Sequence, residues 1–92
     1  MQQHVYDTSY ALTSGIEIRK LSNPVDPDGV KDMVFYLNPY HNGISAKRWH
    51  TTKAEAIADA EALREKKIAS LEKQLAKLRA MTFDAPDLPE EN

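Results

Sequence analysis

Three histidines, at positions 4, 41 and 50, are the side chains of this chain best suited to bind a metal or to transfer protons near neutral pH. Their spacing matches no metal-ligand motif, and the chain contains no cysteine that could complete a zinc site. His41 and His50 could face each other across a hairpin, and a metal site is possible only in that arrangement. We therefore expect no metal and no cofactor.

Other catalytic patterns are also missing from the sequence. Residues 26–32, DPDGVKD, have the composition of a calcium loop, but Gly29 stands too early for an EF-hand and no bidentate glutamate follows. The chain has no glycine-rich phosphate loop, no GxSxG elbow and no serine or cysteine beside a plausible base. We expect that the protein is not an enzyme.

A cluster of basic and aromatic residues could instead bind a partner. The members that we expect at the surface are Tyr40, His41, Lys47 and Arg48, joined by Arg19 and Lys20. Tyrosine and arginine are frequent anchors of protein interfaces, and the same mixture suits single-stranded nucleic acid. Trp49 lies in the same stretch, but we expect it to pack in the core beneath the start of a helix.

The positions of these residues depend on the β-strands that we expect in the first half of the chain. Residue alternation and β-forming composition predict strands at 16–21, 33–37 and 44–51, the last with a bulge. Asp26-Pro27-Asp28-Gly29 predicts a type I turn, and Asn42-Gly43 predicts a hairpin turn. Residues 1–14 are compatible with either a fourth strand or an irregular arm.

A long helix follows the strands, at about residues 52–81. Thr52 and Glu55 have the spacing of a capping box, and neither proline nor glycine interrupts the helix. Residues 84–92 are acidic and proline-rich, and we expect them to be disordered. The sequence therefore predicts one α+β domain over residues 1–83, with a small antiparallel sheet of three or four strands before the helix.

The helix is too long for such a sheet. Thirty residues span about 45 Å, whereas strands of five or six residues span about 17–20 Å. The second half of the helix would leave four large apolar side chains uncovered: Ile68, Leu71, Leu75 and Leu78. A second copy, the N-terminal arm or a target could cover them. We favour a second copy, and hence a homodimer through the helix.

Composition narrows the classes of function. With 92 residues the chain has room for one core, and its formal net charge of −2 excludes a broadly basic nucleic-acid binder. No apolar run approaches the length of a membrane span, and the N-terminus has no signal-peptide pattern. We expect a cytoplasmic protein that makes no membrane contact.

Residues 49–83, WHTTKAEAIADAEALREKKIASLEKQLAKLRAMTF, resemble the C-terminal half of short accessory proteins from temperate phages and prophages. The likeness rests on the tryptophan before a threonine cap, and on KKIASLEKQLAKL followed by an aromatic residue. The small size, acidic balance and absent active site are also similar to those of anti-CRISPR proteins. That class shares no motif, so the resemblance assigns no functional residues.

This resemblance implies a phage-encoded, non-enzymatic inhibitor that acts in the host cytoplasm. Its partner would be a host protein or ribonucleoprotein complex, above all a CRISPR–Cas surveillance complex, which it would bind and block. Two alternatives stay open. One is a dimeric regulator or small nucleic-acid-binding module that uses the basic and aromatic hairpin. The other is a structural or assembly protein that docks through its helix.

Overall fold

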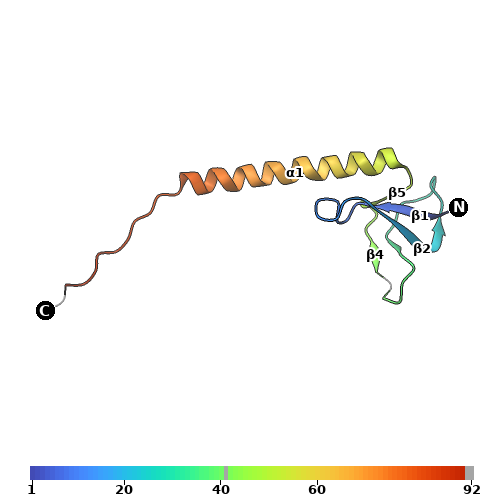
Figure 1. Cartoon of the computed structure of the whole chain (residues 1–92), viewed down its shortest axis with the longest axis horizontal. Coiled ribbons are helices and arrows are strands. Elements are labelled where there is room, and N and C mark those ends of the chain that lie inside the picture. The colour runs from blue at the N-terminus through green and yellow to red at the C-terminus, as the bar shows by residue number, and fades with distance from the viewer. Residues whose placement is uncertain (41, 91–92) are drawn as a thin grey trace.

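The computed structural model describes residues 1–40 and 42–90, and it has two parts. A β-sheet headpiece, residues 1–51, lies at one end, and a single helix projects from it (Figure 1). The molecule measures 80 × 30 × 22 Å along its principal axes. The α+β class, with antiparallel strands followed by one long C-terminal helix, is confirmed.

The main sheet has three antiparallel strands in the order β2–β1–β5. Strand β1 (Gln2–Asp7) lies at its centre, between β2 (Glu17–Val25) and β5 (Trp49–His50). Of the two readings of residues 1–14, the strand is therefore the correct one for residues 2–7. Both other strands of the main sheet therefore pair with this N-terminal segment.

A second sheet is a two-stranded hairpin of β3 (Val34–Phe35) and β4 (Gly43–Ile44). It is joined to β2 by a bridge between Leu21 and Tyr36 and by the Leu37 amide, which donates to the Lys20 carbonyl at 2.7 Å. The nine-residue strand β2 thus belongs to the main sheet and also contacts the segment that follows β3.

Three sequence-based boundaries need correction. The strand expected at 44–51 is two short strands, because residues 46–48 form a turn closed by the Arg48 amide and the Ser45 carbonyl at 2.9 Å. The strand expected at 33–37 has only two ladder residues, and that expected at 16–21 extends to Val25. Gly43 is the first residue of β4, so the hairpin turn expected at Asn42-Gly43 is wrong. A Cβ at Gly43 would stand 3.0 Å from the Met33 sulfur.

The core is small and lies between the sheets and the start of the helix. Four headpiece side chains form it: Val5, Leu21, Ile44 and Trp49. Ile44 and Trp49 differ in strand parity, and the intervening turn is what lets both point inward. The indole N–H of Trp49 donates to the Asp32 carbonyl at 2.7 Å, so this buried polar group is satisfied.

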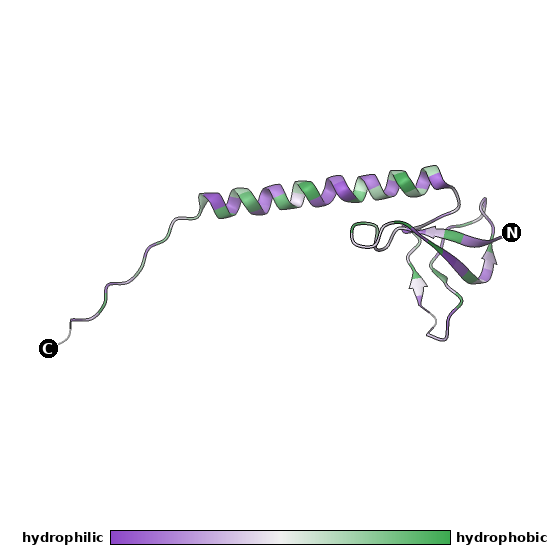
Figure 2. Cartoon of the chain, in the orientation of Figure 1, coloured by the Kyte–Doolittle hydropathy of each residue, from purple (hydrophilic) through white to green (hydrophobic). Residues whose placement is uncertain are grey.

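Helix α1 (Lys53–Ala80) begins as the sequence predicts. The Thr52 hydroxyl accepts the Glu55 amide at 3.2 Å, which is the first of the two capping-box bonds. Ala56 is completely buried, and Asp59, Ala60 and Leu63 are partly covered by the headpiece. Every helical residue after Leu63 is exposed, so α1 leaves the headpiece after about three turns (Figure 2).

The chain after the helix runs away from the headpiece without forming helix or strand in residues 81–90 (Figure 1). Within the described residues, no helix is both long and apolar enough to cross a membrane.

Replacement of Leu21 by alanine tests the importance of the small core. Leu21 is fully buried where β2 meets β3, and we expect Leu21→Ala to lower the free energy of unfolding by about 2–5 kcal/mol. Urea unfolding followed by Trp49 fluorescence measures the change. Leu88→Ala in the exposed segment after α1 is the matched control, and an equal loss in both variants would contradict the core described above.

Candidate functional site: the Asp59 clasp and the exposed hairpin

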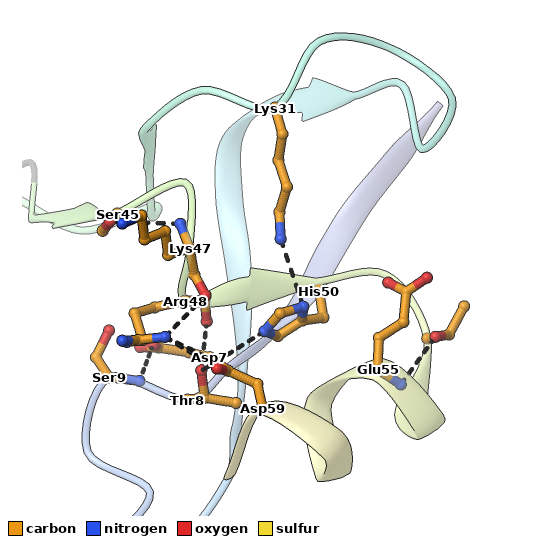
Figure 3. A network of polar contacts seen from close by, with 11 residues as sticks. Asp7, Thr8, Ser9, Lys31, Ser45, Lys47, Arg48, His50, Glu55 and Asp59 are labelled. Atoms are coloured by element: carbon orange, nitrogen blue, oxygen red, sulfur yellow. Dashed lines mark hydrogen bonds and ion pairs between the residues drawn. The ribbon is translucent and has the colours of Figure 1, made fainter. Parts of the chain in front are cut away.

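Four side chains from distant parts of the sequence meet at the second turn of α1 (Figure 3). We call Thr8, Arg48, His50 and Asp59 the Asp59 clasp. Arg48 Nη1 donates to the two Asp59 oxygens at 2.9 and 3.2 Å, and His50 Nε2 lies 3.0 Å from Oδ2. The Asp59 side chain retains only 17% of its exposure. The clasp therefore ties the helix to the headpiece through largely covered, charge-assisted bonds.

Thr8 completes the clasp from the end of β1. Its hydroxyl lies 2.6 Å from Asp59 Oδ2 and 3.0 Å from the Arg48 carbonyl. That carbonyl already accepts the Thr8 amide at 2.9 Å, so we assign the single hydroxyl proton to the carboxylate. Thr8 is completely buried and has no other role in the core. Its conformation is consequently linked to the position of the helix.

His50 connects the clasp to the loop before β3. Its Nδ1 lies 3.4 Å from the Lys31 ammonium, which can only donate, so we assign the proton of a neutral ring to Nε2, facing Asp59. The Lys31 ammonium also lies 5.0 Å from the centre of the Trp49 ring, within the range of a cation–π contact. The loop is thereby held against the same tryptophan that fills the core.

The clasp favours ionised Asp59. Burial raises the pKa of this carboxyl, but hydrogen bonds from Thr8 and His50 and the charge of Arg48 lower it by more, so the pKa lies below its ordinary value. A carboxylate with a lowered pKa is a poor proton acceptor. Thr8 donates to Asp59 rather than to His50, so the base-to-nucleophile contact of a catalytic triad is missing here. The geometry fits a structural ion pair.

The described residues contain no group of three or more His, Asp and Glu side chains that could hold a metal. His50 is engaged by Asp59 and Lys31. His41, the expected partner of His50 across a hairpin, lies outside the described residues, so that part of the metal hypothesis has no geometry to test it.

A second ion-pair group lies inside the main sheet. Arg19 pairs with Glu17 and, at 3.4 Å, with the buried Asp7 carboxylate, and its guanidinium lies 5.1 Å from the centre of the Tyr36 ring. Asp7 also accepts the Ser9 amide at 2.9 Å, which starts the turn after β1. Arg19 is thus occupied in joining β1, β2 and the end of β3.

The residues that the sequence groups as one partner-binding cluster are divided by the structure. Arg19 and Lys20 are consecutive in β2 and so point to opposite faces, with Lys20 exposed. Arg48 is held by Asp59, whereas Lys47 and Tyr40 are exposed. Of the cluster, Lys20, Tyr40 and Lys47 are the described side chains most available to a partner. The binding role itself stays a prediction.

No family model, curated protein or solved structure matches this chain. The resemblance of residues 49–83 to phage accessory proteins therefore has no support beyond the residues that suggest it.

An apolar surface on the β3–β4 hairpin is a better candidate for partner binding. We call Met33, Phe35, Leu37 and Tyr40 the docking face. Phe35 is 48% exposed and Tyr40 is 83% exposed, and Met33 and Leu37 also have more than half of their surface in solvent. Met33 and Phe35 lie over Gly43, and with Pro24 and Val25 they line a shallow groove. The alternation of residues 33–37 groups three of these residues on one side but does not say which side faces outward.

Removal of the Asp59 charge tests the clasp. We expect Asp59→Asn to lower the free energy of unfolding by about 1–3 kcal/mol, since it leaves Arg48 and His50 without their carboxylate partner. Urea unfolding followed by Trp49 fluorescence measures the effect. Glu65→Gln makes the same change on an exposed part of the helix and should alter stability by less than about 0.5 kcal/mol. Equal effects would show that the clasp contributes nothing specific.

The clasp should also weaken in acid. Folded Asp59 binds a proton less readily than the unfolded chain does, so its contribution is complete above the unfolded pKa and is lost as the pH falls through the lowered folded value. We expect the stability difference between wild type and Asp59→Asn to be constant from neutral pH to about pH 5 and to shrink towards about pH 3. A difference that is independent of pH over this range would contradict an ionised clasp.

Proposed function

We propose that the protein is a non-enzymatic binding protein whose headpiece attaches to a partner protein through the docking face. The observation that carries this proposal is the outward position of Met33, Phe35 and Leu37 on a headpiece with very few buried apolar residues. Adjacent exposed apolar side chains are costly unless a partner covers them, and they mark interaction sites more often than chance. The exposed Tyr40, in the turn between β3 and β4, supplies an amphipathic anchor.

The resemblance to phage proteins narrows the choice of partner. It supports an inhibitor that occludes a host defence complex, above all a CRISPR–Cas surveillance complex, in the host cytoplasm. Binding of this kind needs no catalytic group, in keeping with the structural ion pairs that hold Asp7, Arg19 and Arg48 in the headpiece. Lys20 and Lys47 would then lie at the polar rim of the interface or on neighbouring surfaces.

A nucleic-acid-binding module remains the second candidate, because Tyr40 and Lys47 are both exposed. It ranks below protein binding, since Arg19 and Arg48 are each paired with carboxylates and contribute little free positive charge. Binding that weakens steeply with added salt would favour it over the docking face.

Phe35→Ser tests the proposed function. Immobilised full-length protein should capture Cas subunits from the lysate of a CRISPR-bearing host. Its expression in that host should reduce the CRISPR interference that the host directs against an infecting phage. We expect Phe35→Ser to weaken capture by at least about tenfold, as loss of a central aromatic anchor does, and to restore interference.

Ile18→Ser is the matched control, because Ile18 is also a largely exposed apolar residue but lies on the outer face of β2. It should bind like the wild type. Equal losses in the two variants would reject the docking face, and failure of the wild-type protein to capture any Cas subunit or to protect phage would reject the anti-CRISPR function.

A further inference from the structure

The exposed part of α1 carries an apolar row that the headpiece leaves open. Its members are 41–65% exposed, and they are Ile68, Leu71, Leu75 and Leu78. Every helical residue after Leu63 is exposed, so the row begins beyond the part of α1 that the headpiece covers.

The row has the spacing of a coiled-coil seam. Its steps of three, four and three residues place Ile68 and Leu75 at heptad position a, and Leu71 and Leu78 at position d. Extended towards the headpiece, the same register puts Glu61 at a and Arg64 at d. These charged residues end the apolar seam at the point where the headpiece begins, next to a groove under the loop between β1 and β2. A seam confined to residues 67–81 is what the structure leaves free.

We propose that a second copy of this chain covers the row in a parallel two-stranded coiled coil. In this register Lys67 occupies position g and Glu72 position e, and a parallel pair brings Lys67 of one copy to Glu72 of the other. By symmetry the interface contains two such attractive pairs. Ile68 at position a and leucine at both d positions also match the preference of parallel dimers.

An antiparallel pair over the same seam is less favourable. Aligning Ile68 with Leu78 of the other copy brings position e opposite position e, so that Glu72 faces Glu72 at the centre. Lys67 would then face the uncharged Met81 instead of a carboxylate. Glu65 and Arg79 would attract each other in that arrangement, but at its ends. The parallel arrangement has attraction at the centre and no like-charged e–g pair within residues 67–81.

The residues at heptad positions b, c and f, which face away from the seam, are compatible with a two-stranded coiled coil. Ser70 and Lys77 occupy position c, and Lys66 and Lys73 occupy position f, so these lysines remain in water when the seam closes. Position b is alanine in each of three successive heptads, at residues 62, 69 and 76. The basic charge of the C-terminal half of the helix therefore lies away from the seam and does not oppose pairing at close range.

Sedimentation equilibrium of the full chain over a wide concentration range tests self-association. We expect a concentration-dependent rise from the 10.4 kDa monomer to twice that mass. Leu71→Glu and Leu75→Glu should keep the chain monomeric, whereas Lys73→Glu, which changes a lysine at position f, should still dimerise. Both leucines are exposed in the single chain, so an unchanged Trp49 fluorescence spectrum will show that the headpiece stays folded. A monomer at every concentration, or dimers in all variants, overturns the proposal.

Two experiments test the parallel direction. The chain lacks cysteine, so Leu78→Cys introduces one thiol, which lies beside its counterpart only in a parallel pair. We expect oxidation to give a covalent dimer. In the antiparallel pair position 78 lies beside position 68, about 15 Å along the axis from its counterpart, and a dimer that cannot be cross-linked overturns the parallel arrangement.

The charge pair gives the second readout. Lys67→Glu and Glu72→Lys should each weaken dimerisation about two- to threefold, and the double variant should restore it. Equal weakening in the double variant would show that these residues do not face each other. These tests are independent of the docking face, so the dimer and the proposed function can fail separately.

Discussion

The ion pair between Asp59 and the headpiece is the interaction on which the arrangement of this molecule depends. Thr51 and Thr52 join β5 to the helix directly. So short a linker fixes where the helix begins, but not the direction in which it runs. Ala56 adds one small buried side chain at the first turn. Asp59, a turn later, adds bonds to Thr8, Arg48 and His50, which come from different headpiece segments, and so aligns the helix (Figure 3).

A polar clasp is a reasonable solution for so small a protein. The headpiece buries few large apolar side chains, so a broad apolar contact with the helix is not available. A carboxylate that accepts hydrogen bonds from several donors fixes the orientation of the helix as well as attracting it to the headpiece, and a single residue, Asp59, supplies that carboxylate. The arrangement needs all of its partners, since an uncompensated, largely covered carboxylate would oppose folding. Every buried side-chain polar atom within the described residues has a hydrogen-bond partner.

Most local parts of this fold could be predicted from the sequence, with the Asn42-Gly43 turn as an exception, whereas the long-range parts could not. The helix from the Thr52 cap to Met81, the Asp26–Gly29 turn and the uncovered leucine row depend on neighbouring residues or on helical spacing, and they are confirmed. The central position of β1, the turn within residues 44–51 and the clasp depend on pairing between distant segments. Arg48 illustrates the limit: a basic residue in a turn suggests a free surface charge, and only the fold places Asp59 beside it.

The attachment of the helix through the clasp relates the two uncovered surfaces to each other. The docking face lies on the β3–β4 hairpin, whereas the leucine row begins beyond the last helical residue that the headpiece touches (Figures 1 and 2). A flexible joint would let paired headpieces move independently and would reduce the gain from two linked sites. With the clasp closed, the proposed parallel pair would present both docking faces from the same end at a fixed separation. A partner with two matching sites would then bind the pair more tightly than either headpiece alone, without any additional contact.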